Sequence, residues 1–202
     1  DGRNDLVIGR EDGSYVGVYF NDGGSFNRDA PDYKLPKLAH GKGNSHPLDI
    51  RPIDFDLDGF VDLAIFSAGW PNFFPFSLQF YRNIGGKSFK DVTAKVLRNK
   101  PKVRGNLRGL DRLRAVDFYG DGLVDLIGVS EQGFETSSLI FINTGAGGFR
   151  EYDWSFFRDQ QGHPYRTVPP ADLNGDDLPD LVTTSLIKEG KRPTFHFEAY
   201  LN

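Results

Sequence analysis

Short runs of apolar residues alternate with polar positions along the whole chain, and glycine, asparagine or aspartate stands at the ends of most runs. β-Branched and aromatic residues fill these runs, which is typical of strands bounded by turns. No segment keeps a convincing helical period. The pattern predicts two successive sets of four strands, at 50–54, 62–66, 77–81 and 88–92, and at 113–117, 125–129, 139–143 and 149–153.

An asparagine recurs four times along the chain, twice at the end of the third strand of these sets, and three of the four copies precede a glycine turn. The copies are Asn21, Asn83, Asn143 and Asn202, spaced 62, 60 and 59 residues apart. A regular period of this length indicates a repeated four-stranded antiparallel unit. One such sheet cannot bury both of its faces alone, so repeated sheets stack, as the blades of a β-propeller do.

We therefore predict an all-β protein, a β-propeller of four-stranded antiparallel blades of which about 3.5 are present. The expected blades cover residues 1–46, 47–110, 111–162 and 163–202, with three strands each in the first and the last. Because four incomplete blades are few for a closed ring, we expect the chain to be part of a larger propeller or to associate with another copy. The alternative is a four-bladed ring in which strands from both ends complete the first blade.

A loop rich in aspartate joins the first and second strands of the second, third and fourth blades, at 54–62, 117–125 and 172–180. Oxygen ligands at such density suit calcium, which takes six to eight of them. Side chains at loop positions 1, 3, 5 and 9 and the carbonyl group at position 7 are the expected ligands. They are Asp54, Asp56, Asp58, Phe60 and Asp62 in the first loop, Asp117, Asp121, Leu123 and Asp125 in the second, and Asp172, Asn174, Asp176, Leu178 and Asp180 in the third.

The three loops differ in their ligand sets. Tyr119 stands at position 3 of the second loop, and tyrosine is not an ordinary calcium ligand. We therefore expect Ca2+ at the first and third loops, with the loop at Asp117 holding the ion weakly or not at all. An EF-hand is excluded, because its position 12 needs glutamate and the loops have Ile65, Gly128 and Thr183 there. The alternative for every loop is a hydrogen-bonded aspartate turn without metal.

The Asp-x-Asp-x-Asp-Gly-x-x-Asp loop, followed by leucine and later by an aromatic-x-Asn-x-Gly-Gly turn, resembles the FG-GAP or VCBS repeats. These repeats form the calcium-binding blades of integrin α-subunit propellers and of many bacterial surface proteins. The resemblance covers nearly the whole chain. It implies a β-propeller, often seven-bladed, in which calcium is structural. It also implies that the calcium loops line one face and that ligand-binding loops lie on the other.

Composition narrows the class of protein further. The chain of 202 residues has no cysteine, which excludes disulfides, and its net charge of −4 gives no general argument for a nucleic-acid partner. No apolar run approaches the roughly 18 residues of a membrane-spanning helix. No nucleophile elbow, phosphate loop or zinc-protease motif occurs, so we predict no catalytic residue and no enzyme. Weak calcium sites fill outside the cell, which predicts an extracellular, cell-surface or periplasmic location.

Two segments are candidates for partner binding. The first is an aromatic loop between the second and third strands of the second blade, with Trp70, Phe73, Phe74 and Phe76. The second is a basic connector whose central residues are Lys100, Lys102, Arg104 and Arg108. The alternatives are that the aromatic residues cover the next blade and that the basic residues belong to a solvated connector.

These features together favour a calcium-stabilised extracellular binding module that serves adhesion or surface recognition of a protein or glycan. One alternative is a propeller-scaffold enzyme that acts on polysaccharide. The other alternative is a structural unit of a surface fibre or assembly, in which calcium acts as a stiffener and copies self-associate.

Overall fold

A computed structural model describes residues 2–36, 38–39, 44–69, 76–97, 112–129, 139–145, 148–151, 166–167, 170–189 and 192–202. Within these ranges the chain is all-β, with fourteen strands and a single helical turn, α1 (Thr93–Val96). The described residues include no helix with the length and apolar character needed to cross a membrane. The chain divides into two compact units, one of Asp1–Pro52 with Gly59–Thr93 and one of Ile53–Asp58 with Ala94–Asn202.

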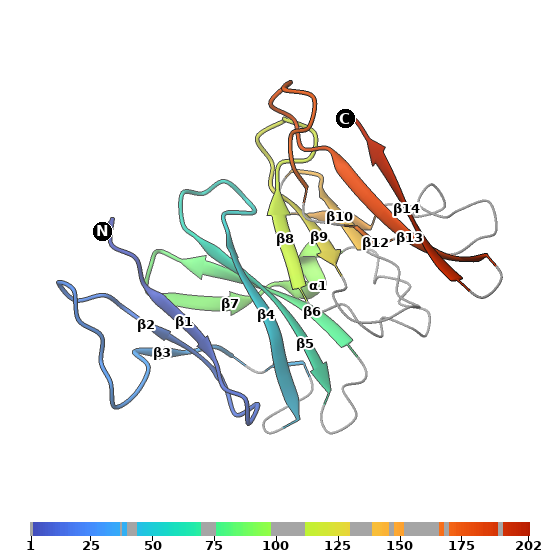
Figure 1. Cartoon of the computed structure of the whole chain (residues 1–202). Helices are drawn as coiled ribbons and strands as arrows, with labels where there is room; N and C mark the ends of the chain where they lie inside the picture. The colour runs from blue at the N-terminus through green and yellow to red at the C-terminus, as the bar shows by residue number, and fades with distance from the viewer. Residues whose placement is uncertain are drawn as a thin grey trace. The chain divides into compact units, whose positions relative to one another are not determined.

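Unit 1 holds two sheets (Figure 1). The first sheet has the order β1-β2-β3, and its strands are β1 (Leu6–Gly9), β2 (Val16–Tyr19) and β3 (Tyr33–Lys34). The second sheet has the order β4-β5-β6-β7, and its strands are β4 (Ser45–Ile53), β5 (Asp62–Gly69), β6 (Phe76–Ile84) and β7 (Ser88–Asp91). Neighbouring strands follow one another along the chain and pair antiparallel, as in β5 with β6.

Unit 2 repeats the plan. The third sheet has the order β11-β10-β9-β8, and its strands are β8 (Arg112–Val116), β9 (Asp125–Val129), β10 (Leu139–Asn143) and β11 (Phe149–Glu151). The fourth sheet has the order β12-β13-β14, and its strands are β12 (Arg166–Thr167), β13 (Leu181–Glu189) and β14 (Arg192–Tyr200). The predicted all-β fold of repeated antiparallel four-stranded sheets is thereby confirmed.

Each unit has a buried apolar cluster to which two consecutive sheets contribute. In unit 1, Val16 and Val18 of β2 join Leu63 and Ile65 of β5. In unit 2, a smaller cluster combines Ile127, Ile140 and Ile142 of the third sheet with Leu181 of the fourth. Side chains alternate between the two faces of a strand, so residues two apart reach the same cluster. Stacking of sheets therefore supplies the cover that a single sheet lacks.

The first strand of the second sheet is longer than the sequence pattern predicts. The prediction places its start at residue 50, whereas β4 begins at Ser45 and includes Pro47 and Pro52. Proline cannot donate a ladder hydrogen bond, and it is tolerated in edge strands, where one side of the strand needs no partner. β4 is the edge of its sheet, and this explains how it accommodates both prolines.

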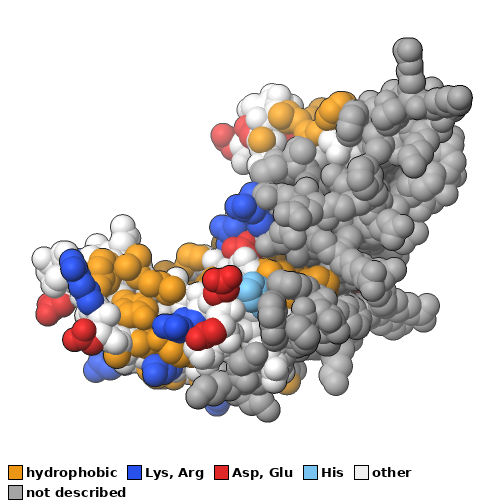
Figure 2. Space-filling view, turned by 60° about the horizontal axis from the view of Figure 1, so that its bottom comes forward, with side chains coloured by type: hydrophobic (Ala, Val, Ile, Leu, Met, Phe, Trp, Pro, Cys, Tyr) orange, Lys and Arg blue, Asp and Glu red, His pale blue; other side chains and the backbone are white. Residues whose placement is uncertain are grey.

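The first sheet carries an apolar surface. Figure 2 shows hydrophobic side chains gathered on the side of the molecule where Figure 1 draws β1–β3, with lysine or arginine and acidic side chains among them. Leu6 and Ile8, two apart on β1, are 43% and 45% exposed. Charges of both signs accompany this surface.

Candidate metal centre

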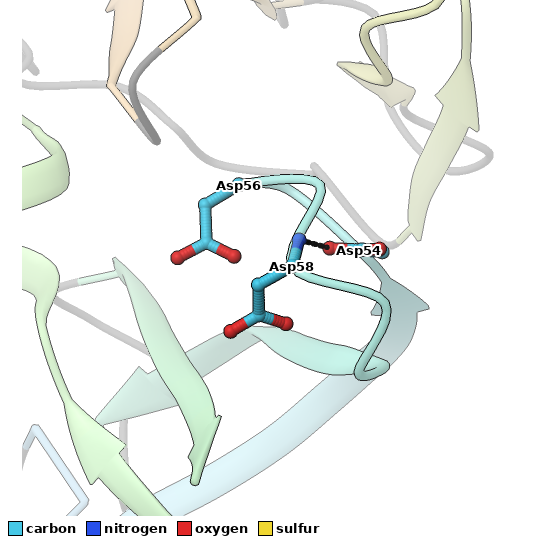
Figure 3. A group of neighbouring side chains, drawn as sticks. All are labelled: Asp54, Asp56 and Asp58. Atoms are coloured by element: carbon cyan, nitrogen blue, oxygen red, sulfur yellow. Dashed lines mark hydrogen bonds between the residues drawn. The ribbon is translucent and has the colours of Figure 1, made fainter. Parts of the chain in front are cut away.

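Three aspartates of the first loop come together just after β4 ends (Figure 3). Asp54, Asp56 and Asp58 each offer a carboxylate oxygen, and these oxygens all lie within 4.8 Å of one another. The turn that gathers them has a hydrogen bond from the backbone N–H of Asp58 to Oδ1 of Asp54, at 3.2 Å. Leu57 and Gly59 adopt left-handed backbone conformations, with φ of 56° and 86°, which turn the chain sharply between the side chains.

This donor set fits a calcium ion. Calcium binds oxygen at 2.3–2.6 Å, so two ligands of one ion lie at most about 5 Å apart, and the oxygens of Asp54, Asp56 and Asp58 meet that limit. Two like charges about 4 Å apart repel by roughly 4 kcal/mol at an effective dielectric constant near 20. A divalent cation would replace this repulsion with attraction, and carboxylates are ligands that calcium prefers.

The other two loops form the same turn. The N–H of the residue at position 5 donates to Oδ1 of the aspartate at position 1, from Asp121 to Asp117 at 3.1 Å and from Asp176 to Asp172 at 3.2 Å. The N–H at position 6 donates to Oδ2 of the same aspartate, at 2.7 Å in the second loop and 3.0 Å in the third. In the third loop, hydrogen bonds from backbone N–H groups, first that of Gly175 and then those of Asp177 and Asp176, hold the pKa of Asp172 below its usual value.

The second and third loops share the backbone turn of the first loop, but their side chains at positions 3 and 5 make different contacts. Counting histidine, aspartate and glutamate side chains alone, the group at Asp54 is the one among the described residues in which three offer ligand atoms within 4.8 Å of one another. In the third loop, Nδ2 of Asn174 donates to Oδ2 of Asp176 at 2.8 Å. In the second loop, the ring of Tyr119 is 46% exposed and meets the ring of Phe118 edge-on at 5.4 Å.

The aspartates at position 9, predicted as ligands, are buried at the start of the second strand of each sheet. Asp62, Asp125 and Asp180 are at most 1% exposed. Oδ1 of each accepts the backbone N–H of an asparagine at the end of the third strand, at 2.7, 2.7 and 2.8 Å. Oδ2 of Asp125 also accepts the N–H of Phe118 at 3.0 Å, and Oδ2 of Asp180 that of Leu173 at 2.8 Å. These carboxylates therefore clamp the strand ends, and their role as calcium ligands stays a prediction.

Burial raises the pKa of Asp125 to about 6. The N–H groups of Asn143 and Phe118 favour the ionised form and work against that shift, while the charges of Asp121 and Asp117 add to it. Desolvation thus outweighs the two hydrogen bonds.

The residues predicted to offer a carbonyl group at position 7 lie at the loop exits. Phe60 is 42% exposed, and Leu123 and Leu178 are half-buried. The N–H groups of Leu123 and Leu178 donate to Oδ1 of the aspartate at position 5, both at 2.9 Å. Their carbonyl groups as ligands stay a prediction.

Sequence reasoning missed the roles of the repeated asparagines, although their period indicated the repeated unit. Asn143 caps the turn after β10, because its Oδ1 accepts the N–H of Gly145 at 3.1 Å. Its Nδ2 donates to the carbonyl oxygen of Phe55 at 2.9 Å and, at 3.4 Å, to that of Val124. Asn202 donates in the same way to the carbonyl oxygen of Phe118. Asn143 and Asn202 thus each contact the aspartate loop of the sheet before their own, whereas Nδ2 of Asn21 and Asn83 donates to the carbonyl oxygens of Asn4 and Val61.

The predicted partner-binding residues fall mostly outside the described ranges. Trp70, Phe73 and Phe74 of the aromatic loop lie there, as do Lys100, Lys102, Arg104 and Arg108 of the basic connector. Phe76 begins β6, and its ring stacks on that of Phe66 with a centroid distance of 5.5 Å and an angle of 9°. A partner-binding role for all of these residues stays a prediction.

Comparison with known proteins identifies the repeat in one part of the chain. A family model described as FG-GAP-like repeat matches residues 117–183, from the second aspartate loop into β13. The match confirms the resemblance, and this stretch of the chain carries an FG-GAP-like repeat. A search of curated proteins found no match. The repeat and the antiparallel four-stranded sheets together define a protein of the β-propeller type.

Proposed function

We propose that this β-propeller-type protein is a calcium-stabilised extracellular binding module that recognises a protein or glycan in adhesion or at a surface. The observation that carries the calcium part is the group of Asp54, Asp56 and Asp58, whose oxygens lie within 4.8 Å of one another. The repetition of the same turn at Asp117 and Asp172 supports it, because one backbone geometry presents carboxylates in three loops.

Calcium in this loop acts on stability. The loop connects β4 with β5, so an ion bound there restrains the junction between two strands. A ligand at ten times its dissociation constant adds about 1.4 kcal/mol to the free energy of unfolding by mass action. Sites of such moderate affinity fill at extracellular calcium concentrations and stay empty in the cytosol, which supports the proposed location.

The proposal assigns no catalytic residue to the chain. A propeller-scaffold enzyme acting on polysaccharide and a structural unit of a surface assembly are the competing proposals. Glycan and protein arrays probed with the purified chain report binding. Incubation of the chain with a polysaccharide reports turnover, because an enzyme releases soluble product and a recognition module leaves the polysaccharide intact. Light scattering on the same sample detects the self-association that a structural unit requires.

We expect millimolar calcium to raise the melting temperature by about 3–6 °C over the same protein in excess chelator. The measurement is thermal unfolding followed by circular dichroism. Asp56→Ala, which removes a ligand carboxylate, is expected to abolish the part of the rise that this loop contributes. Magnesium should give a smaller rise, because it demands near-ideal octahedral geometry. An unchanged wild-type melt, or an equal rise in Asp56→Ala, would refute calcium binding at this loop.

A further inference from the structure

The peptide between the first two proposed ligands is held by the next sheet. Phe55 lies between Asp54 and Asp56, and its side chain is 1% exposed. Its carbonyl oxygen accepts Nδ2 of Asn143, at the end of β10, at 2.9 Å. Its ring meets the ring of Phe149, at the start of β11, edge-on at 6.2 Å. Backbone and ring of this residue are thus both fixed by the third sheet, which explains why Ile53–Asp58 belongs to unit 2.

The same arrangement recurs one repeat later. Phe118 occupies the equivalent position of the second loop, and its carbonyl oxygen accepts Nδ2 of Asn202. Its side chain packs against the cluster of Ile127, Ile140, Ile142 and Leu181, and Tyr200 of the fourth sheet packs against the same cluster. In the third loop the equivalent residue is Leu173, which is 52% exposed. Two separate copies of one contact argue that the contact is a property of the repeat.

The donor in this contact is itself held in place. The backbone N–H of Asn143 donates to Oδ1 of Asp125 at 2.7 Å, and its Oδ1 accepts the N–H of Gly145 at 3.1 Å. The residue is 3% exposed, so its amide has little freedom to turn. A fixed donor holds its acceptor without losing further conformational entropy. The hydrogen-bonded path therefore runs from the start of β9 through Asn143 to the Asp54 loop.

We infer that Asn143 and Asn202 are positioning residues that set the calcium affinity of the aspartate loop in the preceding sheet, an inference that rests on the proposed function. The ion and the asparagine stabilise the same loop conformation, so each strengthens the binding of the other. This coupling is reciprocal by thermodynamic necessity. Calcium at the Asp54 loop accordingly tightens the contacts of Phe55 with Asn143 and Phe149, and loss of the Asn143 amide weakens calcium binding.

The test compares two variants, Asn143→Ala and Asn202→Ala, each titrated with calcium by calorimetry. Asn143→Ala is expected to raise the dissociation constant of the Asp54 loop at least about fivefold, the lower end of ordinary coupling between sites. The side chain of Asn202 contacts the second loop and not the first. Asn202→Ala should therefore leave the calcium affinity of the Asp54 loop unchanged. In an Asp56→Ala background, where the Asp54 site has lost one ligand carboxylate and is disabled, Asn143→Ala should have no further effect on calcium binding.

A second measurement on the wild-type chain covers the case in which Asn143→Ala fails to fold. Calcium should slow hydrogen exchange at the backbone amides of Asn143, Gly145 and Phe149, and this protection should be absent in Asp56→Ala, which lacks a ligand carboxylate. Equal loss of affinity in both asparagine variants, or wild-type calcium binding without this protection, overturns the positioning role while the proposed function stands. A wild-type chain that binds no calcium overturns both, and its own titration identifies that outcome.

Discussion

Replacing Phe55 with alanine is expected to lower the free energy of unfolding by about 3–5 kcal/mol, as large-to-small changes of buried phenylalanine do. The side chain is 1% exposed, so its removal leaves a cavity beside Phe149, with which it makes an edge-on ring contact. The lost transfer free energy and the cavity both contribute to the cost. Urea unfolding followed by fluorescence or circular dichroism measures the effect.

Phe60 provides a matched control for Phe55. It lies in the same aspartate loop, has the same side chain and is 42% exposed. Phe60→Ala is expected to change the free energy of unfolding by no more than about 1 kcal/mol, because surface substitutions cost little. Equal losses in the two variants would show that the ring of Phe55 is not the anchor that holds this loop.

Replacing Asp125 with alanine is expected to lower the free energy of unfolding by about 2–6 kcal/mol, since each buried donor left unsatisfied costs about 1–3 kcal/mol. The carboxylate accepts two backbone N–H groups, from Asn143 at 2.7 Å and from Phe118 at 3.0 Å. Its side chain is 1% exposed, so water has little access to replace those bonds. Chemical denaturation in chelator measures this role apart from any effect of calcium.

Two further variants serve as controls for the loss of stability in Asp125→Ala. Asp121→Ala removes an exposed carboxylate of the same loop that accepts the N–H of Leu123, and a loss below about 1 kcal/mol is expected. Asp125→Asn keeps one acceptor oxygen and should fall between wild type and Asp125→Ala. A loss in Asp125→Ala no larger than that in Asp121→Ala would contradict the structural role assigned to the buried carboxylate.

The repeat made the fold predictable from local patterns. Alternating apolar residues bounded by glycine and asparagine placed the strands of the second and third sheets, and the asparagine period ordered them. The start of β4 escaped prediction, because prolines such as Pro47 argue against a strand unless the strand is known to lie at an edge. Edge position is a property of the assembled sheet, which local sequence does not carry.

The candidate site was predictable only in part, for a physical reason. Aspartate density located the loops, and the structure brings Asp54, Asp56 and Asp58 together as expected. Burial distinguishes Asp62 and Asp125 from these three, yet all five are aspartates of one motif. The donors to the buried carboxylates are backbone N–H groups, from the third strand of the sheet and, for Asp125, also from Phe118 of the same loop, and backbone N–H groups are alike at nearly every residue. Sequence alone therefore cannot assign these hydrogen bonds.

The central claim is that Asp54, Asp56 and Asp58 hold calcium, and a crystal structure grown in millimolar calcium tests it most directly. The account predicts an anomalous scattering peak between the three carboxylates, with their oxygens 2.3–2.6 Å from the ion. The peak should vanish in crystals of Asp56→Ala, which lacks one of the three carboxylates, grown in the same solution. Well-ordered density for the loop without such a peak would contradict the claim and leave the aspartates as a metal-free turn.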